Sequence, residues 1–399
     1  MKNLPQRFMG YKYQKKSNTC PFRGKEKIAL ESTIQAVKTH IPITTFGTFI
    51  SDEIITTTVG MCLKHYSPTE ICKTPGINFP SGTTYRNCID TIDFDTLIKN
   101  NPALFSEYSH QILKKGKKYI FAVDEVTDPY YGEKIPENED FIVGGKQKKS
   151  TNYFYSYITL YITIRNRRVT LAVFPVRKSE TKVSYIKRFI DIIRSKGYLI
   201  SVLLLDRGFW SAEVFQYLKN ENIPHIMPVK AHGEKLKNLL DSYDIRQFTY
   251  PLCENSENEI DLDIMRFTGR KRSKKTGKMV DKNYGFVYYG IEWSLLKIRN
   301  AYKSRFSIES SYRMRNIVRP KTSTRKPAVR YFFAIVSFLL KNIWVVTLLE
   351  NFRRKQRGPF VIISEWFRFD AFIDRMWNTI LNSTLNQFHI LNGSDITIK

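Results

Sequence analysis

Short runs of apolar residues divide the middle of this 399-residue chain into alternating strands and helices. β-Branched and aromatic residues gather in five runs that we predict to be strands: residues 118–124, 153–164, 169–176, 199–206 and 224–229. Apolar positions three and four residues apart predict two helices between the last three strands, over residues 180–197 and 211–222. The continuous apolar run at 199–206 is typical of a central parallel strand. This order predicts an α/β fold, with a mixed sheet flanked by helices.

Residues 1–115 are predicted to form a basic arm, over residues 1–29, followed by a helical region that binds DNA. Within it, residues 67–92 have the outline of a helix-turn-helix. Ser67 and Ser81 can each cap a short helix, and Pro75 and Gly76 separate the two helices. The second helix would present residues 83–87 to a DNA groove, although any two short helices joined by such a turn give the same pattern.

Residues 116–229 are predicted to be the first part of the core, and residues 230–300 a β-rich insertion. The stretch from 266 to 282 is so basic that we expect a loop that contacts phosphates. Its candidate DNA-binding residues are Arg270, Lys271, Arg272, Lys274 and Lys275. Residues 284–289 resemble a strand.

Residues 301–352 are predicted to complete the core, and residues 353–399 to form a tail of helix and loop. The run at 332–349 is apolar enough to suggest a membrane span. Lys341 and Asn342 lie at its centre, however, where a charge is costly in lipid. We therefore predict a buried core helix and no membrane partner.

The charge of the chain favours a polyanionic partner. Its 64 Lys and Arg residues outnumber 37 Asp and Glu residues, which gives a formal net charge of +27. Nucleic acid is the partner that such an excess favours. The five cysteines are scattered without a CxxC pair, which argues against a disulfide framework or a zinc site and favours a reducing compartment. The six histidines show no ligand spacing, and no signal peptide is evident at the N-terminus.

Asp124 and Asp206 each follow an apolar run that we predict to be a strand. If the two strands are neighbours, their carboxylates point at the same place and can share a divalent cation such as Mg²⁺. The simpler interpretation is that each aspartate caps the following turn.

A helix predicted over residues 302–318 carries a third carboxylate. At about 100° per residue, Tyr302, Arg305, Glu309, Arg313 and Asn316 share one face of this helix. A solvated stripe of ion pairs would give the same pattern. A glutamate among arginines also suits a phosphodiester site, where the carboxylate binds metal and the arginines bind phosphate.

Together, these segments resemble the DDE transposases of the IS4-type insertion sequences. That family carries Tyr-x2-Arg-x3-Glu-x6-Lys on its last catalytic helix, and this chain has Tyr302, Arg305 and Glu309 in place. The segments LLLDRGFWS around Asp206 and FAVDEVTDPYYG around Asp124 are similar to the other two motifs. The resemblance covers about residues 115–350. Asn316 stands at the lysine position, and Arg315 or Arg313 is expected to contact phosphate instead.

The resemblance implies an RNase H-like core and two Mg²⁺ or Mn²⁺ ions bound by Asp124, Asp206 and Glu309. It implies cleavage at transposon ends followed by strand transfer into target DNA. Tyr302 and Arg305 would position phosphate. Double-stranded DNA would be the partner, a homodimer would form the synaptic complex, and the protein would act in a prokaryotic cytoplasm at the nucleoid. The alternatives are a non-catalytic DNA-binding derivative, a nuclease with the same core, and a basic membrane-associated protein.

Overall fold

The computed structural model describes residues 25–75, 77–164, 167–242, 246–273, 277–306, 309–362 and 367–391. Most of the predicted basic arm, together with Lys274 and Lys275, lies outside these residues. The side chains of Lys271 and Glu309 also lie outside the description, although both backbones are placed.

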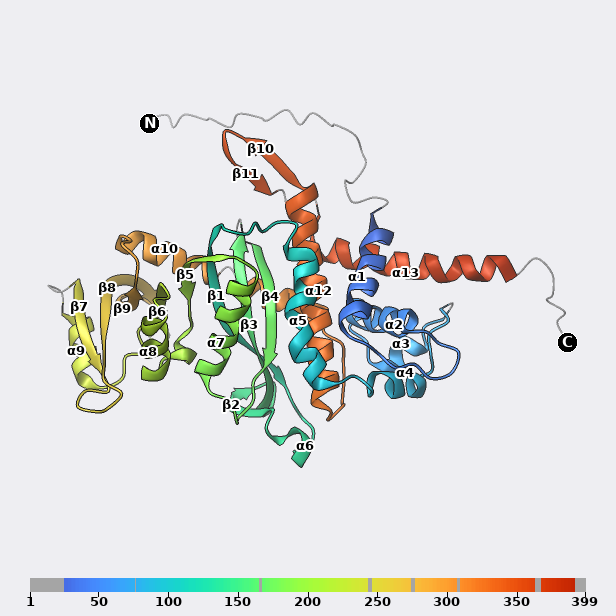
Figure 1. Cartoon of the computed structure of the whole chain (residues 1–399), viewed down its shortest axis with the longest axis horizontal. Coiled ribbons are helices and arrows are strands. Elements are labelled where there is room, and N and C mark those ends of the chain that lie inside the picture. The colour runs from blue at the N-terminus through green and yellow to red at the C-terminus, as the bar shows by residue number, and fades with distance from the viewer. Residues whose placement is uncertain are drawn as a thin grey trace.

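A nine-stranded mixed sheet forms the centre of the molecule (Figure 1). Its order is β2-β3-β1-β5-β6-β9-β8-β7, and β4 also pairs with β3. The strands are β1 (Lys118–Pro129), β2 (Ile142–Lys148), β3 (Thr151–Ile164), β4 (Arg167–Pro175), β5 (Leu199–Leu204), β6 (His225–Pro228), β7 (Gln247–Leu252), β8 (Ile260–Arg272) and β9 (Met279–Tyr289). The pairs β1–β5 and β5–β6 are parallel, and the other pairs are antiparallel. The predicted fold class and the predicted order of the core strands are confirmed.

Two details of the core differ from the prediction. Asp124 lies inside β1 rather than at its end, because β3 continues to pair with β1 as far as Pro129. The Gly- and Lys-rich segment after β1, for which the sequence pattern predicted no helix or strand, has regular structure. It contains the short helix α6 (Pro136–Glu139) and the edge strand β2, whose backbone pairs with β3 although most of its side chains are exposed.

Helices cover both faces of the sheet. Side chains alternate between the faces along β1. Glu125 points toward α7 (Lys182–Ser195), where it pairs with Lys182, and Asp124 points toward α10 (Leu295–Phe306), where it pairs with Arg305. The remaining core helices are η1 (Arg207–Phe209) and α8 (Ala212–Asn220), which follow β5, and α11 (Glu309–Ile317), which follows α10.

The long apolar helix α12 (Pro327–Asn351) is a core helix, as predicted. It is the one helix within the described ranges that is long and apolar enough to cross a membrane, and its apolar window is fully buried. Its two central polar residues bond to β4, whose outer edge lacks a neighbouring strand at that point. Lys341 donates to the Arg168 carbonyl at 2.8 Å. The Asn342 amide accepts from the Thr170 N–H at 2.9 Å and donates to the Thr170 carbonyl at 2.6 Å, as a paired strand would.

Replacing Asn342 with leucine is expected to lower the free energy of unfolding by about 2–4 kcal/mol. The change leaves the buried N–H and carbonyl of Thr170 without partners, at about 1–3 kcal/mol for each group. Urea denaturation followed by circular dichroism measures the loss. Asn87→Leu, at an exposed helical position, is the control. Equal stability of the two variants would show that α12 does not depend on these bonds.

The N-terminal helices form a second unit beside the sheet (Figure 1). They are α1 (Glu26–His40), α2 (Ser51–Lys64), α3 (Pro68–Cys72), α4 (Gly82–Ile89) and α5 (Phe94–Ser109). The helix α13 (Phe369–Leu391), from the predicted tail, packs against α1 and α2, and Arg375 pairs with Glu26 at 2.8 Å. A hairpin of β10 (Arg353–Gln356) and β11 (Gly358–Ile362) precedes it. The predicted N-terminal region and the predicted C-terminal tail therefore pack against each other.

The two short helices predicted within residues 67–92 are present as α3 and α4. Ser67 forms a reciprocal capping box with Glu70, and Ser81 caps α4. Tyr85, which we expected to face DNA, is instead buried and bonds to Thr58. The neighbouring residues Thr83, Arg86 and Asn87 are exposed. DNA reading by α4 stays a prediction for these exposed residues.

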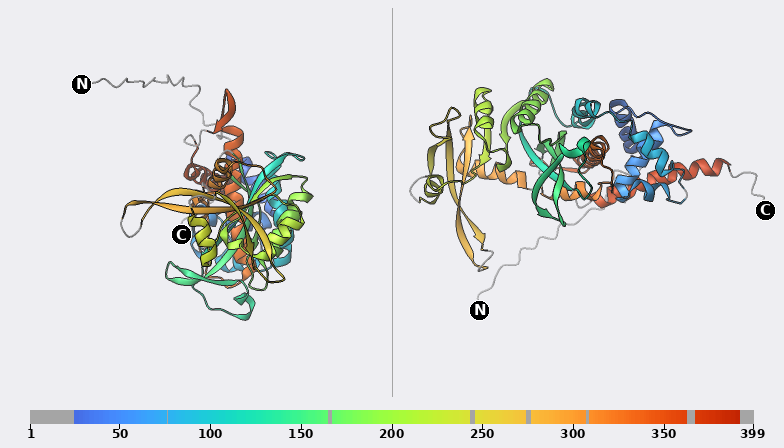
Figure 2. Two further views of the ribbon diagram at one scale, coloured as in Figure 1. Left: turned by 90° about the vertical axis from the view of Figure 1, so that its left-hand side faces the viewer. Right: turned by 90° about the horizontal axis from the view of Figure 1, so that it is seen from below.

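The predicted insertion extends the central sheet rather than forming a separate body. Its strand β9 pairs with β6, and α9 (Glu234–Asp241) packs on β9. The basic stretch expected to be a loop lies largely in the β8–β9 hairpin, which projects from the sheet in Figure 2. The strands form because the backbone pairs regularly, with Arg270 opposite Asp281. Both of these side chains are exposed, whereas Arg266 at the start of the stretch is buried.

Candidate active site

Asp124 and Asp206 occupy equivalent places on two adjacent parallel strands. Ala122 of β1 lies opposite Leu204 of β5, and each aspartate comes two residues later. Asp206 lies two residues beyond the end of β5 and immediately before the turn η1. The expectation that the two strands are neighbours and direct both carboxylates to one place is confirmed.

Arg305 of α10 joins the two carboxylates. Its Nη1 lies 3.3 Å from Oδ1 of Asp124, and its Nη2 lies 3.0 Å from Oδ1 of Asp206. The side chain of Arg305 is 7% exposed, that of Asp124 is 15% exposed, and that of Asp206 is 44% exposed. Burial disfavours the charged guanidinium, but the charge of Asp124 and that of Asp206 outweigh it, so the pKa of Arg305 lies above its ordinary value.

Tyr302 supports Arg305 from one turn earlier in α10. The guanidinium carbon of Arg305 lies 5.0 Å from the centre of the Tyr302 ring, and this ring packs against Phe286. Burial raises the pKa of the Tyr302 hydroxyl above its ordinary value. Tyr302 and Arg305 therefore contact each other, and Arg305 contacts both aspartates. Contact of either residue with phosphate stays a prediction.

Glu309 is the first residue of α11. The single helix predicted over residues 302–318 is described as α10 and α11, on either side of residues 307 and 308, which lie outside the description. The shared face proposed for five residues of that helix is therefore not shown. Among the described side chains, no three metal-binding groups come together, and the side chain of Glu309 is not among them.

The two aspartates fit a divalent cation. Both offer carboxylate oxygens, the ligands that Mg²⁺ prefers. In this structure they flank a positive charge, that of Arg305, so their position already favours a cation. The two aspartate carboxylates therefore suit such an ion, and the side chain of Glu309 lies outside the description.

A buried polar cluster supports the backbone at Asp124, and the sequence analysis did not find it. Thr159 of β3 donates to the Asp124 carbonyl at 3.3 Å. Arg168 of β4 bonds to Thr159 and donates to the Tyr312 hydroxyl of α11 at 2.8 Å. Its guanidinium also lies 3.4 Å from the centre of the Tyr161 ring. The sequence signal that could have indicated this cluster is Arg168 itself, a charged residue at the start of an otherwise apolar strand.

A pocket of about 570 Å³ opens beside Asp206, between the β8–β9 hairpin and α10. The Phe267 ring is stacked on Tyr284 and on Phe286, each with ring centres 5.2 Å apart. Four basic side chains also line it: Arg207, Arg270, Arg299 and Lys303. Stacked aromatic rings with basic side chains are typical of nucleic-acid binding surfaces. Sequence reasoning identified Arg270 of this set but missed the aromatic rings.

The other residues predicted to contact DNA differ in how exposed their side chains are. Arg313 is exposed, as is Asn316, and Arg270 is exposed and pairs with Asp281. Arg272 donates to the Gly277 carbonyl at 2.8 Å. Arg315 does not lie on the exposed surface of α11, and its contact with phosphate stays a prediction. Its side chain is 0% exposed because it faces the sheet and pairs with Asp128 at 2.6 Å.

The fold of this chain is shared with a DNA transposase. One similar structure is that of piggyBac transposase in a synaptic complex with hairpin DNA. The TM-score is 0.54 and the sequence identity is 11%, over 94% of this chain and 81% of that chain. No protein-family model matches the sequence, and a search of curated proteins finds no match.

Proposed function

We propose that this protein is a DDE transposase of the IS4 type, which cleaves DNA at transposon ends and joins the ends to target DNA. The observation that carries the proposal is that Asp124 and Asp206 lie at equivalent places along two neighbouring parallel strands. The guanidinium group of Arg305 lies between their carboxylates. The fold shared with a transposase and the net charge of +27 support it.

In this proposal Asp124, Asp206 and Glu309 hold two Mg²⁺ or Mn²⁺ ions. Such ions, when bound, activate the attacking water or 3′-hydroxyl and stabilise the leaving oxygen. Arg305 reduces the repulsion between the two aspartates and keeps both directed at one point. The Thr159 hydroxyl fixes the backbone of Asp124 from the neighbouring strand.

Double-stranded DNA is the proposed substrate, both as transposon ends and as target. The aromatic and basic pocket beside Asp206 would hold the strand near the reacting phosphate, and the exposed basic residues of the β8–β9 hairpin would contact the backbone farther out. We further propose that a homodimer brings two ends together and that the protein acts at the nucleoid in a prokaryotic cytoplasm.

The test is cleavage and joining of duplex DNA that carries the sequences flanking the gene. We expect nicking at the ends, and joining to a plasmid, in Mg²⁺ or Mn²⁺ and neither in EDTA. Glu309→Gln should bind the same DNA without cutting it. Metal-dependent cutting without joining would favour a nuclease, and binding without any cutting would favour a non-catalytic DNA-binding protein.

A further inference from the structure

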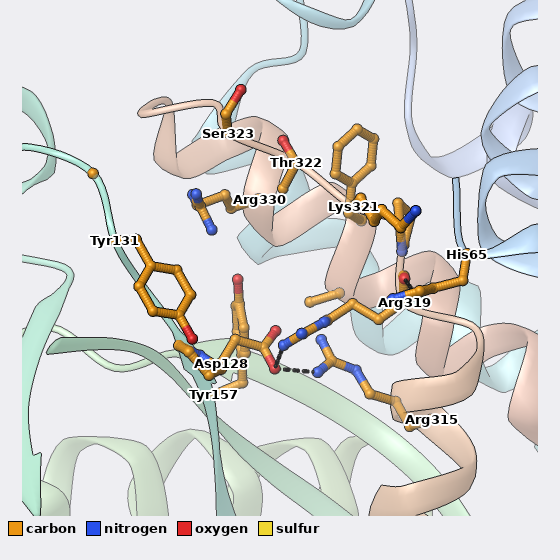
Figure 3. A pocket seen from close by; sticks show the side chains of 15 residues that line it. His65, Asp128, Tyr131, Tyr157, Arg315, Arg319, Lys321, Thr322, Ser323 and Arg330 are labelled. Atoms are coloured by element: carbon orange, nitrogen blue, oxygen red, sulfur yellow. Dashed lines mark hydrogen bonds and ion pairs between the residues drawn. The ribbon is translucent and has the colours of Figure 1, made fainter. Parts of the chain in front are cut away.

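A second pocket, of about 390 Å³, lies beside the end of β1 (Figure 3). Its floor is Asp128, four residues after Asp124, so the two side chains share a face of the strand. Four residues of strand span about 13 Å. The other walls come from the end of α11, the segment from 319 to 323, and α12. Its volume is within the range of small-ligand pockets, about 300–1,000 Å³.

The charge of this second pocket is strongly positive. Four of its side chains are basic: Arg315, Arg319, Lys321 and Arg330, of which Lys321 also pairs with Glu70 outside the pocket. Asp128 is the one acid among the lining residues, and it accepts from Arg319 at 2.8 Å as well as from Arg315. One carboxylate therefore faces an excess of guanidinium groups, which is an environment for an anion.

Arg315 supplies an independent sign of a missing partner. Its Nη1 donates to Asp128, but its Nε and Nη2 are buried and make no hydrogen bond to any part of the chain that the structure describes. Buried polar groups are nearly always bonded, and each unmet one costs free energy. In Figure 3 the Arg315 and Arg319 guanidinium groups reach from one side of the pocket toward Asp128, and Arg330 lies above them.

An exposed aromatic ring stands at the opening. Tyr131 is 67% exposed, and its hydroxyl donates to the Lys149 carbonyl at 2.7 Å, which fixes the ring at the rim. Figure 3 shows it across the pocket from Arg319. A fixed, accessible ring beside guanidinium groups combines base stacking with phosphate binding.

We propose that this pocket binds the phosphate of an unpaired DNA nucleotide and that the base stacks on Tyr131. The assignment to DNA rests on the proposed function. At about 3.4 Å of duplex axis per nucleotide, the span of about 13 Å corresponds to about four nucleotides from the reacting phosphate. Forked guanidinium groups favour a phosphate, and the position favours one belonging to the strand held at Asp124.

The test uses the full chain and a short single-stranded DNA that carries iododeoxyuridine, irradiated without added metal. We expect a cross-link to Tyr131, identified by peptide mapping and retained in Tyr131→Phe. Tyr131→Ala should weaken binding about five-fold or more, as expected for loss of base stacking. Because Tyr131 is exposed, this variant tests the pocket without disturbing the core.

Arg319→Gln should weaken binding and lower the slope of log K against log salt by about 0.7, the value for one phosphate on a single strand. Arg325→Gln is the matched control, because Arg325 lies two residues beyond the segment from 319 to 323, pairs with Glu133 and does not line the pocket. Cross-links elsewhere, with both pocket variants binding like Arg325→Gln, would overturn the proposal. A Tyr131 cross-link in a protein that never cuts DNA would support the pocket and reject the transposase. DNA cleavage by a protein whose pocket variants bind DNA normally would support the transposase and reject the pocket.

Discussion

Asp124→Asn is expected to reduce DNA strand cleavage by about three orders of magnitude while leaving DNA binding intact. A metal ion contributes several kcal/mol of charge stabilisation in the transition state, and each 1.36 kcal/mol is a factor of ten in rate. Asparagine is a poor ligand for such an ion, yet its carbonyl oxygen still accepts a hydrogen bond from Arg305. The fold should therefore persist. Single-turnover cleavage of labelled end DNA measures the rate, and anisotropy measures binding.

Glu125→Gln is the control for this variant. Glu125 is the next residue in β1, but it faces the opposite side of the sheet and pairs with Lys182 at 2.7 Å. The same chemical change there should leave cleavage within a few-fold of the original rate. If Asp124→Asn cut DNA as fast as Glu125→Gln, the proposed catalytic residues would be wrong.

Asp128→Ala is expected to lower the free energy of unfolding by about 3–5 kcal/mol, the usual cost of removing one partner of a buried ion pair. Arg315 would then keep a fully buried charge with no acid beside it. Burial opposes ionisation of Asp128, but Arg315 and Arg319 overcome it and hold the pKa of this carboxyl below its ordinary value. Chemical denaturation at neutral pH measures the loss.

Two further variants test whether the loss of stability in Asp128→Ala comes from the buried ion pair. Glu133→Ala removes an exposed partner of Arg325 and should cost less than about 1 kcal/mol. Adding Arg315→Met to Asp128→Ala should restore part of the lost stability, because the unpaired charge is removed as well. If Asp128→Ala were no more costly than Glu133→Ala, the buried pair would not support the core.

The parts of the fold that depend on local pattern could be predicted from the sequence. The apolar run of β5 identified a central parallel strand, and Ser67 and Ser81 identified the starts of α3 and α4. Lys341 and Asn342 correctly argued for a core helix, although their acceptors on β4 could not be known. In each of these cases the deciding information lies within a few residues of the element.

The parts that failed depend on contacts between distant segments. Arg315 and Asp128 are 187 residues apart, so nothing near Arg315 reveals that it faces inward. Arg270 appears to belong to a loop until Asp281 is placed opposite it on the paired strand. The position of Asp124 within β1 follows from the length of β3. The proximity of Asp124 and Asp206 was predictable because it depends only on which strands are neighbours. The hydrogen bond between Arg168 and Tyr312 depends on the exact packing of α11 on β4, which the sequence pattern does not reveal.

The packing of α13 against α1 has a consequence for synthesis of the chain. Arg375 and its partner Glu26 are 349 residues apart. At translation rates of about 5–20 residues per second, roughly 20–70 s pass between the emergence of one and the other from the ribosome. During that interval the surface of α1 and α2 that later receives α13 is uncovered and available to chaperones. The N-terminal helical unit is completed only after the residues of the central sheet have been made.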